Sequence, residues 1–144
     1  MLFRSMSNKD ALIHNFKVIH LTGILQNNYS ESINSDNYFS TQAVFEDMPQ
    51  LLSSVDYILC RAGLGTISEL EFLHKKAFLV PLPNSHQELN AELVKDKFVI
   101  LEQKNSEQWI NSILDKNIFD DKSFGQSQSW QDEEYYERLE DLLS

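Results

Sequence analysis

The chain has 144 residues, a formal net charge of −10 and 42% hydrophobic residues, among them nine Phe, five Tyr and two Trp. This content is enough for one folded domain with a hydrophobic core, and the acidic balance disfavours nucleic acid and anionic membranes, which are bound through clustered Lys and Arg. Because no run approaches the roughly 20 apolar residues of a membrane span, and the first residues lack the apolar segment of a signal peptide, the sequence predicts a cytoplasmic domain.

Five short β-rich runs alternate with longer, helix-like segments along the chain. The runs are Lys17–Thr22, Tyr38–Val44, Asp56–Cys60, Ala77–Pro81 and Phe98–Leu101. The segments between them suit the crossover helices that join parallel strands and are too long for hairpins. The runs YILC and AFLVP are continuously apolar, which is typical of strands covered on both faces. The sequence therefore predicts an α/β fold, a Rossmann-like parallel sheet with helices on both faces.

Two helices are predicted in the first half of the chain. The segment MSNKDALIHNF, ahead of the first run, has Leu12, Ile13 and Phe16 on one apolar side at helical spacing. Further along, Asp47 is expected to cap a helix that has Pro49 in its first turn. Both helices precede strands, as an α/β fold requires.

Two more helix starts are predicted in the second half. Thr66 stands three residues before Glu69, which is the spacing of a capping box. Asn105 or Ser106 can cap a helix that continues through Trp109 with helical periodicity. We expect these two helices to follow the third and fifth strands.

Composition divides the chain into three parts. Residues 1–116 hold all five predicted strands and form the candidate binding domain. Residues 117–129 are polar and read as a linker, and residues 130–144 resume helical periodicity. Between residues 120 and 144, eight acids stand against two basic residues, which is typical of a solvated helix face.

Cys60 is the only cysteine, so neither an internal disulfide nor a cysteine-based metal site can form. At the end of an apolar run, it is interpreted as a small buried hydrophobe rather than a nucleophile. His14, His20 and His74 show no spacing that suits a metal. We therefore expect no metal and no cofactor.

The most informative stretch is DYILCRAGLGTISELEFL, in which an apolar strand leads through a glycine-containing loop directly into a helix. Gly63 and Gly65 either let a ligand approach the backbone or adopt a positive φ, and the first N–H groups of the helix attract an anion. The pattern favours phosphate binding, although a tight structural turn would look similar. It is neither the Walker lysine loop nor the full dinucleotide fingerprint, and the acidic residues of a receiver domain do not follow the first and third strands.

Four segments in this order and spacing resemble the C-terminal domain of the MurG family, glycosyltransferases of family 28 with the two-domain GT-B fold. They are LTG, VFEDMPQLLSSVDYILCRAGLGTISEL, AFLVPLP and HQELNA, within about residues 16 to 115. The resemblance implies a domain that binds UDP-N-acetylglucosamine for transfer to the lipid-linked muramyl-pentapeptide of peptidoglycan synthesis. Arg61, which the resemblance implies is a donor-binding residue, favours this family among its relatives, because the sequence R-A-G resembles the lipid-intermediate enzyme.

The resemblance also implies a donor site, residue by residue. The backbone around Phe45, next to Met48, would face the uracil, and Leu64, Gly65 and Thr66, after Gly63, would lie along the pyrophosphate. Glu69 would accept hydrogen bonds from the ribose hydroxyls, a task that suits a carboxylate because it can accept two donors. Its alternative role is the capping box with Thr66.

The amides of Gln87 and Asn90 complete the implied site. They fall at positions i and i+3 of one helix, so both can point to the same side, and amides can bind the hydroxyl and acetamido groups of a hexose. A solvated helix start is the alternative. His86 either contacts the donor phosphate or merely flanks the loop.

The resemblance implies a second, N-terminal domain that carries the acceptor site and the catalytic base, and a first strand that this chain lacks. Two hypotheses follow: a donor-binding half of an inverting N-acetylglucosaminyltransferase that needs the N-terminal domain or a partner chain, or a non-catalytic nucleotide-sugar-binding or interaction module. Unpaired strand edges are costly. We therefore expect strands 17–22 and 56–60, which would flank the absent strand, to pair directly with each other.

Overall fold

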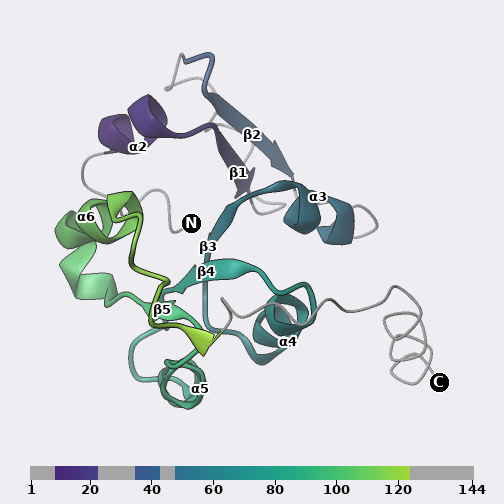
Figure 1. Cartoon of the computed structure of the whole chain (residues 1–144), viewed down its shortest axis with the longest axis vertical. Helices are drawn as coiled ribbons and strands as arrows, with labels where there is room; N and C mark the ends of the chain where they lie inside the picture. Colours follow the sequence, from purple (N-terminus) through teal and green to yellow (C-terminus); the bar gives the residue numbers. More distant parts are fainter. Residues whose placement is uncertain (1–8, 23–34, 43–47, 124–144) are drawn as a thin grey trace.

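The computed structural model describes residues 9–22, 35–42 and 48–123 (Figure 1). The strands are β1 (Val18–Thr22), β2 (Tyr38–Gln42), β3 (Tyr57–Cys60), β4 (Lys76–Leu79) and β5 (Val99–Ile100). The helices are α2 (Lys9–Asn15), α3 (Met48–Ser54), α4 (Leu64–Phe72), α5 (His86–Leu93) and α6 (Trp109–Leu114), with a 3-10 helix, η3, at Gln103–Gln108. All five predicted strands are present, each within a few residues of its predicted run.

The strands form two parallel sheets. One contains β1 and β2, with Val18 opposite Tyr38, and the other has the order β3-β4-β5, with Tyr57 opposite Lys76 and Phe78 opposite Val99. Every connection within a sheet is therefore a crossover rather than a hairpin. The prediction of an α/β fold with parallel, Rossmann-like strands and flanking helices is confirmed.

Strand β4 is the centre of the larger sheet and contributes to two hydrophobic cores. Ala77 and Leu79 belong to one core, together with Ile67 and Leu70 of α4 and Ala91 of α5. Phe78 belongs to the other core, with Leu12 and Ile13 of α2 and Trp109 and Ile110 of α6, and Val80 just past the strand joins it. Because successive strand residues point to opposite faces, this division places helices on both faces of the sheet (Figure 1). The continuously apolar sequence AFLV is explained by burial on both faces.

The expected direct pairing of strands 17–22 and 56–60 is wrong. Within the described residues no backbone ladder joins β1 to β3, and no other strand lies between them. Side chains connect the two sheets instead: Phe16, just before β1, meets Tyr57 edge-on with ring centroids 6.4 Å apart.

The segment after β5 begins differently from its prediction. Neither Asn105 nor Ser106 caps a helix, because residues 103–108 form η3, and α6 then starts without a side-chain cap. The indole Nε1 of Trp109 donates to the carbonyl oxygen of Glu102 at 2.8 Å, and Trp109 is 1% exposed. Burial of this indole and its hydrogen bond explain the tight turn that precedes α6.

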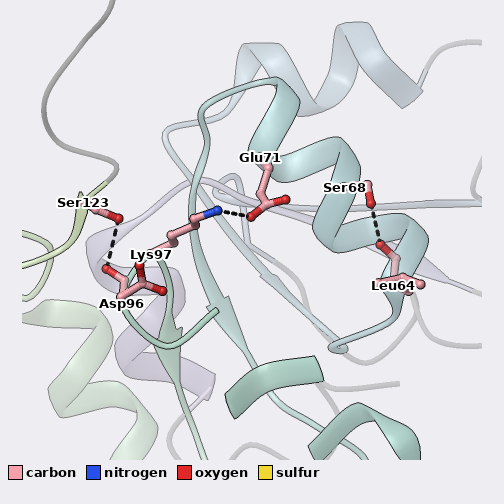
Figure 2. A network of polar contacts seen from close by, with 6 residues as sticks. All are labelled: Leu64, Ser68, Glu71, Asp96, Lys97 and Ser123. Atoms are coloured by element: carbon pink, nitrogen blue, oxygen red, sulfur yellow. Dashed lines mark hydrogen bonds and ion pairs between the residues drawn. The ribbon is translucent and has the colours of Figure 1, made fainter. Parts of the chain in front are cut away.

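The first residues of the predicted linker pack on the domain. Phe119 is buried against Phe78, with ring centroids 5.1 Å apart, and the Ser123 N–H donates to the carbonyl oxygen of Asp96 at 3.0 Å. Figure 2 shows Ser123 beside Asp96 and the neighbouring ion pair between Lys97 and Glu71 of α4. Residues up to 123 are thus part of the packed domain, and the predicted helix at 130–144 lies outside the described residues. In the part of the chain that the structure describes, no helix combines the length and the apolar character of a membrane span.

Candidate functional site

The three strands of the larger sheet end at one edge, because they are parallel. Strand β3 leads through Arg61, Ala62 and Gly63 into α4, β4 leads through a proline-containing loop into α5, and β5 leads into η3. In open parallel sheets, ligands bind at this carboxyl edge, where loops and helix N-termini converge. The predicted site residues from Arg61 onward lie in these connections.

Helix α4 begins at the glycine loop, earlier than the capping-box prediction requires. Gly63 is the N-cap residue, with φ −73° and ψ 141°, and no side chain caps the helix. Thr66 is the third helical residue, so the capping-box role of Thr66 and Glu69 is wrong. The first N–H groups of an α-helix have no intrahelical acceptor, so this uncapped end can offer donors to a ligand.

The glycines themselves are not required by the packing around them. Neither Gly63 nor Gly65 has a positive φ, which rules out that role. A Cβ atom at Gly65 would meet nothing within 4 Å, and one at Gly63 would lie 3.8 Å from Thr66 Oγ1, an ordinary contact. The alternative prediction remains, in which the two glycines leave the backbone at the start of α4 accessible to a ligand.

Arg61, in the connection between β3 and α4, bonds to the connections that follow β4 and β5. Its Nη1 donates to the carbonyl oxygen of Val80 at 3.3 Å and to Gln103 Oε1 at 2.7 Å. Desolvation by partial burial lowers the pKa of the guanidinium, which nevertheless stays charged at any physiological pH. The positive charge therefore has a fixed place beside the start of α4.

Helix α5 is positioned by a cap that the sequence analysis missed. The Ser85 hydroxyl oxygen accepts from the Gln87 N–H at 3.2 Å, and Glu88 Oε2 accepts from the Asn84 N–H at 3.2 Å. The S-x-x-E pattern in SHQE was the signal, because this spacing is typical of a helix start. The cap fixes which residues of α5 face the edge of the sheet.

Gln87 and Asn90 both bond to backbone groups at this edge. Gln87 Oε1 accepts from the Leu82 N–H at 3.0 Å, and Asn90 Nδ2 donates to the Ala62 carbonyl oxygen at 3.1 Å. Both side chains are half-buried. The two bonds lead to different loops, that of Gln87 to the loop after β4 and that of Asn90 to the connection between β3 and α4, and the predicted role of the two amides at a sugar remains a prediction.

The remaining predicted residues differ in their exposure and in their contacts. Leu64 is 69% exposed at the start of α4, and His86 is exposed as the first residue of α5. Glu69 is exposed on α4, and its carboxylate has no hydrogen-bond or ion-pair partner among the described residues. Met48 begins α3 and is half-buried, without a described bond to α4 or α5. Phe45 lies outside the described residues.

Cys60 is the last residue of β3 and packs against the core under α4 and α5. Burial raises the pKa of its thiol to about 12, so the side chain stays protonated at neutral pH. A protonated thiol is a weak nucleophile. Among the described residues, no group of three or more His, Cys, Asp or Glu side chains is placed to hold a metal ion.

Comparison with known proteins gives a family match over nearly the whole chain. The model of the "Glycosyltransferase family 28 C-terminal domain" matches residues 2–138. This range includes the glycine loop, both amides of α5 and all five strands.

Two similar curated proteins carry the name UDP-N-acetylglucosamine–N-acetylmuramyl-(pentapeptide) pyrophosphoryl-undecaprenol N-acetylglucosamine transferase. The one from Clostridium botulinum is 35% identical over 122 residues, which cover 81% of this chain and 33% of the relative. The one from Prochlorococcus marinus (strain MIT 9515) is 34% identical over 117 residues, covering 76% and 32%. The chain thus spans about a third of the length of these relatives. No solved structure matches.

Proposed function

Because this chain belongs to the family of glycosyltransferase family 28 C-terminal domains, we propose that it binds a nucleotide-sugar donor, UDP-N-acetylglucosamine, at the carboxyl edge of β3, β4 and β5. The observation that carries the proposal is the start of α4, a helix N-terminus without a side-chain cap, with Gly63 at the N-cap and Gly65 in the first turn, neither of which the packing requires. The relatives' shared name supplies the identity of the sugar nucleotide.

The pyrophosphate of the donor would lie against Leu64, Gly65 and Thr66. Their backbone N–H groups and the helix dipole attract an anion without a cationic side chain, and the open space at Gly65 lets the phosphates approach. Arg61 adds a positive charge beside this position. Uracil would lie near Phe45 and Met48, and His86 would flank the phosphates.

Glu69 would bind the ribose. Its carboxylate is exposed and does not cap the helix, so both oxygens are available to accept bonds from the two ribose hydroxyls. Glu69 lies on α4, five residues after Leu64, which is the first residue of the helix. The nucleoside would therefore extend along α4 from the phosphate-binding end.

The reaction in which this domain takes part would be transfer of N-acetylglucosamine to a lipid-linked muramyl-pentapeptide. The acceptor hydroxyl would attack the anomeric carbon, the bond to the β-phosphate would break, and UDP would leave with the negative charge. The α4 N-terminus would stabilise that charge as it develops. The acceptor site and the catalytic base would come from an N-terminal domain or partner chain, and the whole protein would act at the cytoplasmic face of the membrane.

Calorimetric or NMR titration of the 144-residue chain with UDP-N-acetylglucosamine, UDP, ADP and NAD tests the donor assignment. We expect the two uridine nucleotides to bind in preference to ADP and NAD, with a dissociation constant as weak as about 1 mM, or about −4 kcal/mol. Equal responses to all four nucleotides, or none, would contradict the proposal.

Glu69→Ala tests the ribose contact, with Leu64→Ala as a matched truncation of another exposed side chain on α4. Loss of a hydrogen bond to a charged group predicts weaker UDP binding by about 1 to 3 kcal/mol for Glu69→Ala and a smaller change for Leu64→Ala. The melting temperature of each variant is measured alongside. Equal affinities of the two variants would remove Glu69 from the site.

A further inference from the structure

The guanidinium of Arg61 is held through one of its nitrogen atoms. Both of its described hydrogen bonds start at Nη1, one to the carbonyl oxygen of Val80 at 3.3 Å and one to Oε1 of Gln103 at 2.7 Å. Nη1 carries two N–H groups, so these bonds use both of them. The N–H groups on Nη2 and Nε have no hydrogen-bond partner among the described residues. Arg61 therefore combines a fixed position with donors that the described residues leave unused.

Both partners of Arg61 are uncharged oxygen atoms, which hold the guanidinium without neutralising it. The ion pairs among the described residues all involve lysines, and none includes Arg61. Glu102 precedes Gln103 in the chain, but its Oε2 lies 3.3 Å from Lys104 Nζ and accepts from Asn105 Nδ2 at 3.0 Å. Burial lowers the pKa of Arg61, whereas an adjacent carboxylate would raise it. The positive charge at this edge is thus not compensated within the described part of the chain.

The backbone that carries Gln103 is fixed by the core. The Leu101 N–H donates to the Leu79 carbonyl oxygen at 2.9 Å, which continues the pairing of β4 and β5. The carbonyl oxygen of Glu102 accepts from the buried indole of Trp109 at 2.8 Å. The half-buried side chain of Gln103 is therefore attached to rigid backbone. Its bond to Arg61 spans 42 residues of sequence and joins the connection after β5 to the one between β3 and α4.

We infer that Gln103 is a positioning residue for the donor site: it holds the Arg61 guanidinium at the carboxyl edge through a neutral acceptor, so that the full positive charge acts on the diphosphate proposed at the start of α4. The inference rests on the proposed function for its ligand. Arg61 stands two residues before Gly63, the N-cap of α4, so its charge adds to the positive end of the helix dipole. A carboxylate at position 103 would hold the same guanidinium but would offset its charge.

The ligand-free chain tests the positioning role. Gln103→Ala removes the shorter of the two bonds, and we expect the Arg61 Nε–H group to become more mobile, with a lower order parameter in nitrogen NMR relaxation. Gln103→Glu retains an oxygen that accepts from Nη1, so the order parameter should be unchanged or higher. An Arg61 order parameter that stays the same in Gln103→Ala would overturn the positioning role.

Titration with UDP separates position from charge. Gln103→Glu keeps Arg61 in place but pairs it with a carboxylate, and we expect UDP affinity to fall by about tenfold, or about 1.4 kcal/mol. Gln108→Glu is the matched control, because it adds the same charge at an exposed position of η3 that has no described bond to Arg61. Solvent screens a charge at such a position, so the control should lower UDP affinity by less than about twofold. Equal losses in the two variants would overturn the inference.

A double-mutant cycle shows whether Gln103 acts through Arg61. Arg61→Met removes the positive charge, and Gln103→Glu added to it should lower UDP affinity no more than Gln108→Glu does. If Gln103→Glu costs as much UDP affinity in the Arg61→Met chain as in the unmodified chain, the inference is wrong. Failure of the unmodified chain to bind UDP would contradict the proposed function, and the order parameter of Arg61 would still decide the positioning role.

Discussion

The two sheets of this domain are both parallel, yet they are buried to different degrees. Phe78 in the three-stranded sheet is 1% exposed, and its neighbours Ala77 and Leu79 on the opposite face are 0% exposed. In the two-stranded sheet, Phe39 is 57% and Ile19 42% exposed, and these two residues stand opposite each other on the same face. Parallel strands are normally covered on both faces. The central strand of the larger sheet is therefore covered on both faces by described residues, whereas the face of the smaller sheet that carries Ile19 and Phe39 has little cover among them.

The same substitution in the two sheets should give the largest contrast. Phe78→Ala removes a ring that packs against Tyr57 and Phe119, and we expect it to lower the free energy of unfolding by about 3 to 5 kcal/mol. Phe39→Ala should change it by no more than about 0.5 kcal/mol, as is usual for surface positions. Urea unfolding measures both. A cost above about 2 kcal/mol for Phe39→Ala would mean that this face is covered in solution.

The buried face of the smaller sheet should contribute less, through one polar pair. The Tyr38 hydroxyl lies 2.6 Å from His20 Nδ1, and both side chains are buried. Tyr38→Phe should lower the free energy of unfolding by about 1 kcal/mol, and Tyr57→Phe, at a 39% exposed ring of the larger sheet, should have no measurable effect.

Tyr38 also predicts a pH dependence. Burial raises the pKa of its hydroxyl above the ordinary value of 10.0, so the folded state retains the proton to a higher pH than the unfolded state does. The corresponding stability is fully present below pH 10 and is lost as the pH rises through the folded value. Tyr38→Phe should flatten this decline in urea unfolding above pH 10. A decline that is unchanged in the variant would assign it to another group.

The smallest effect is expected at the periphery of the larger sheet. Lys97 Nζ and Glu71 Oε1 are 2.5 Å apart, but their side chains remain 38% and 34% exposed, so solvent screens the pair (Figure 2). A double-mutant cycle with Lys97→Met and Glu71→Gln should give a coupling of less than about 1 kcal/mol that decreases with salt. The more exposed pair Lys95 and Glu92 should couple even less. A larger coupling at the exposed pair would contradict this order.

The sequence predicted elements well where local pattern decides them. The five strands and the helix that includes Leu12 and Ile13 were visible as apolar runs or helical spacing. Helix starts were predicted less well, because Thr66 and Asn105 are plausible caps in isolation. The structure instead starts α4 at Gly63 without a side-chain cap, and places the indole of Trp109, bonded to the Glu102 carbonyl, at the start of α6.

The site was predictable in its residues but not in its orientation. The types and spacing of Gln87 and Asn90 indicated two amides on one helix side. Each amide is oriented by a backbone partner, which is the Leu82 N–H for Gln87 and, for Asn90, the Ala62 carbonyl oxygen, 28 residues away in sequence. The pairing expected between β1 and β3 was likewise inferred from chain order alone, whereas the contacts that join the two sheets, such as Phe16 with Tyr57, are tertiary.

Strand β4 has a consequence for how the domain loses its structure. Its alternate residues contribute to the cores on both faces, so neither core can be disrupted while the other stays intact. The larger sheet and the helices on its two faces should consequently open as a single cooperative unit. The slowest-exchanging amides would then be those of Phe78 and Leu79. The loops at the carboxyl edge would keep their arrangement only while this cooperative unit is folded.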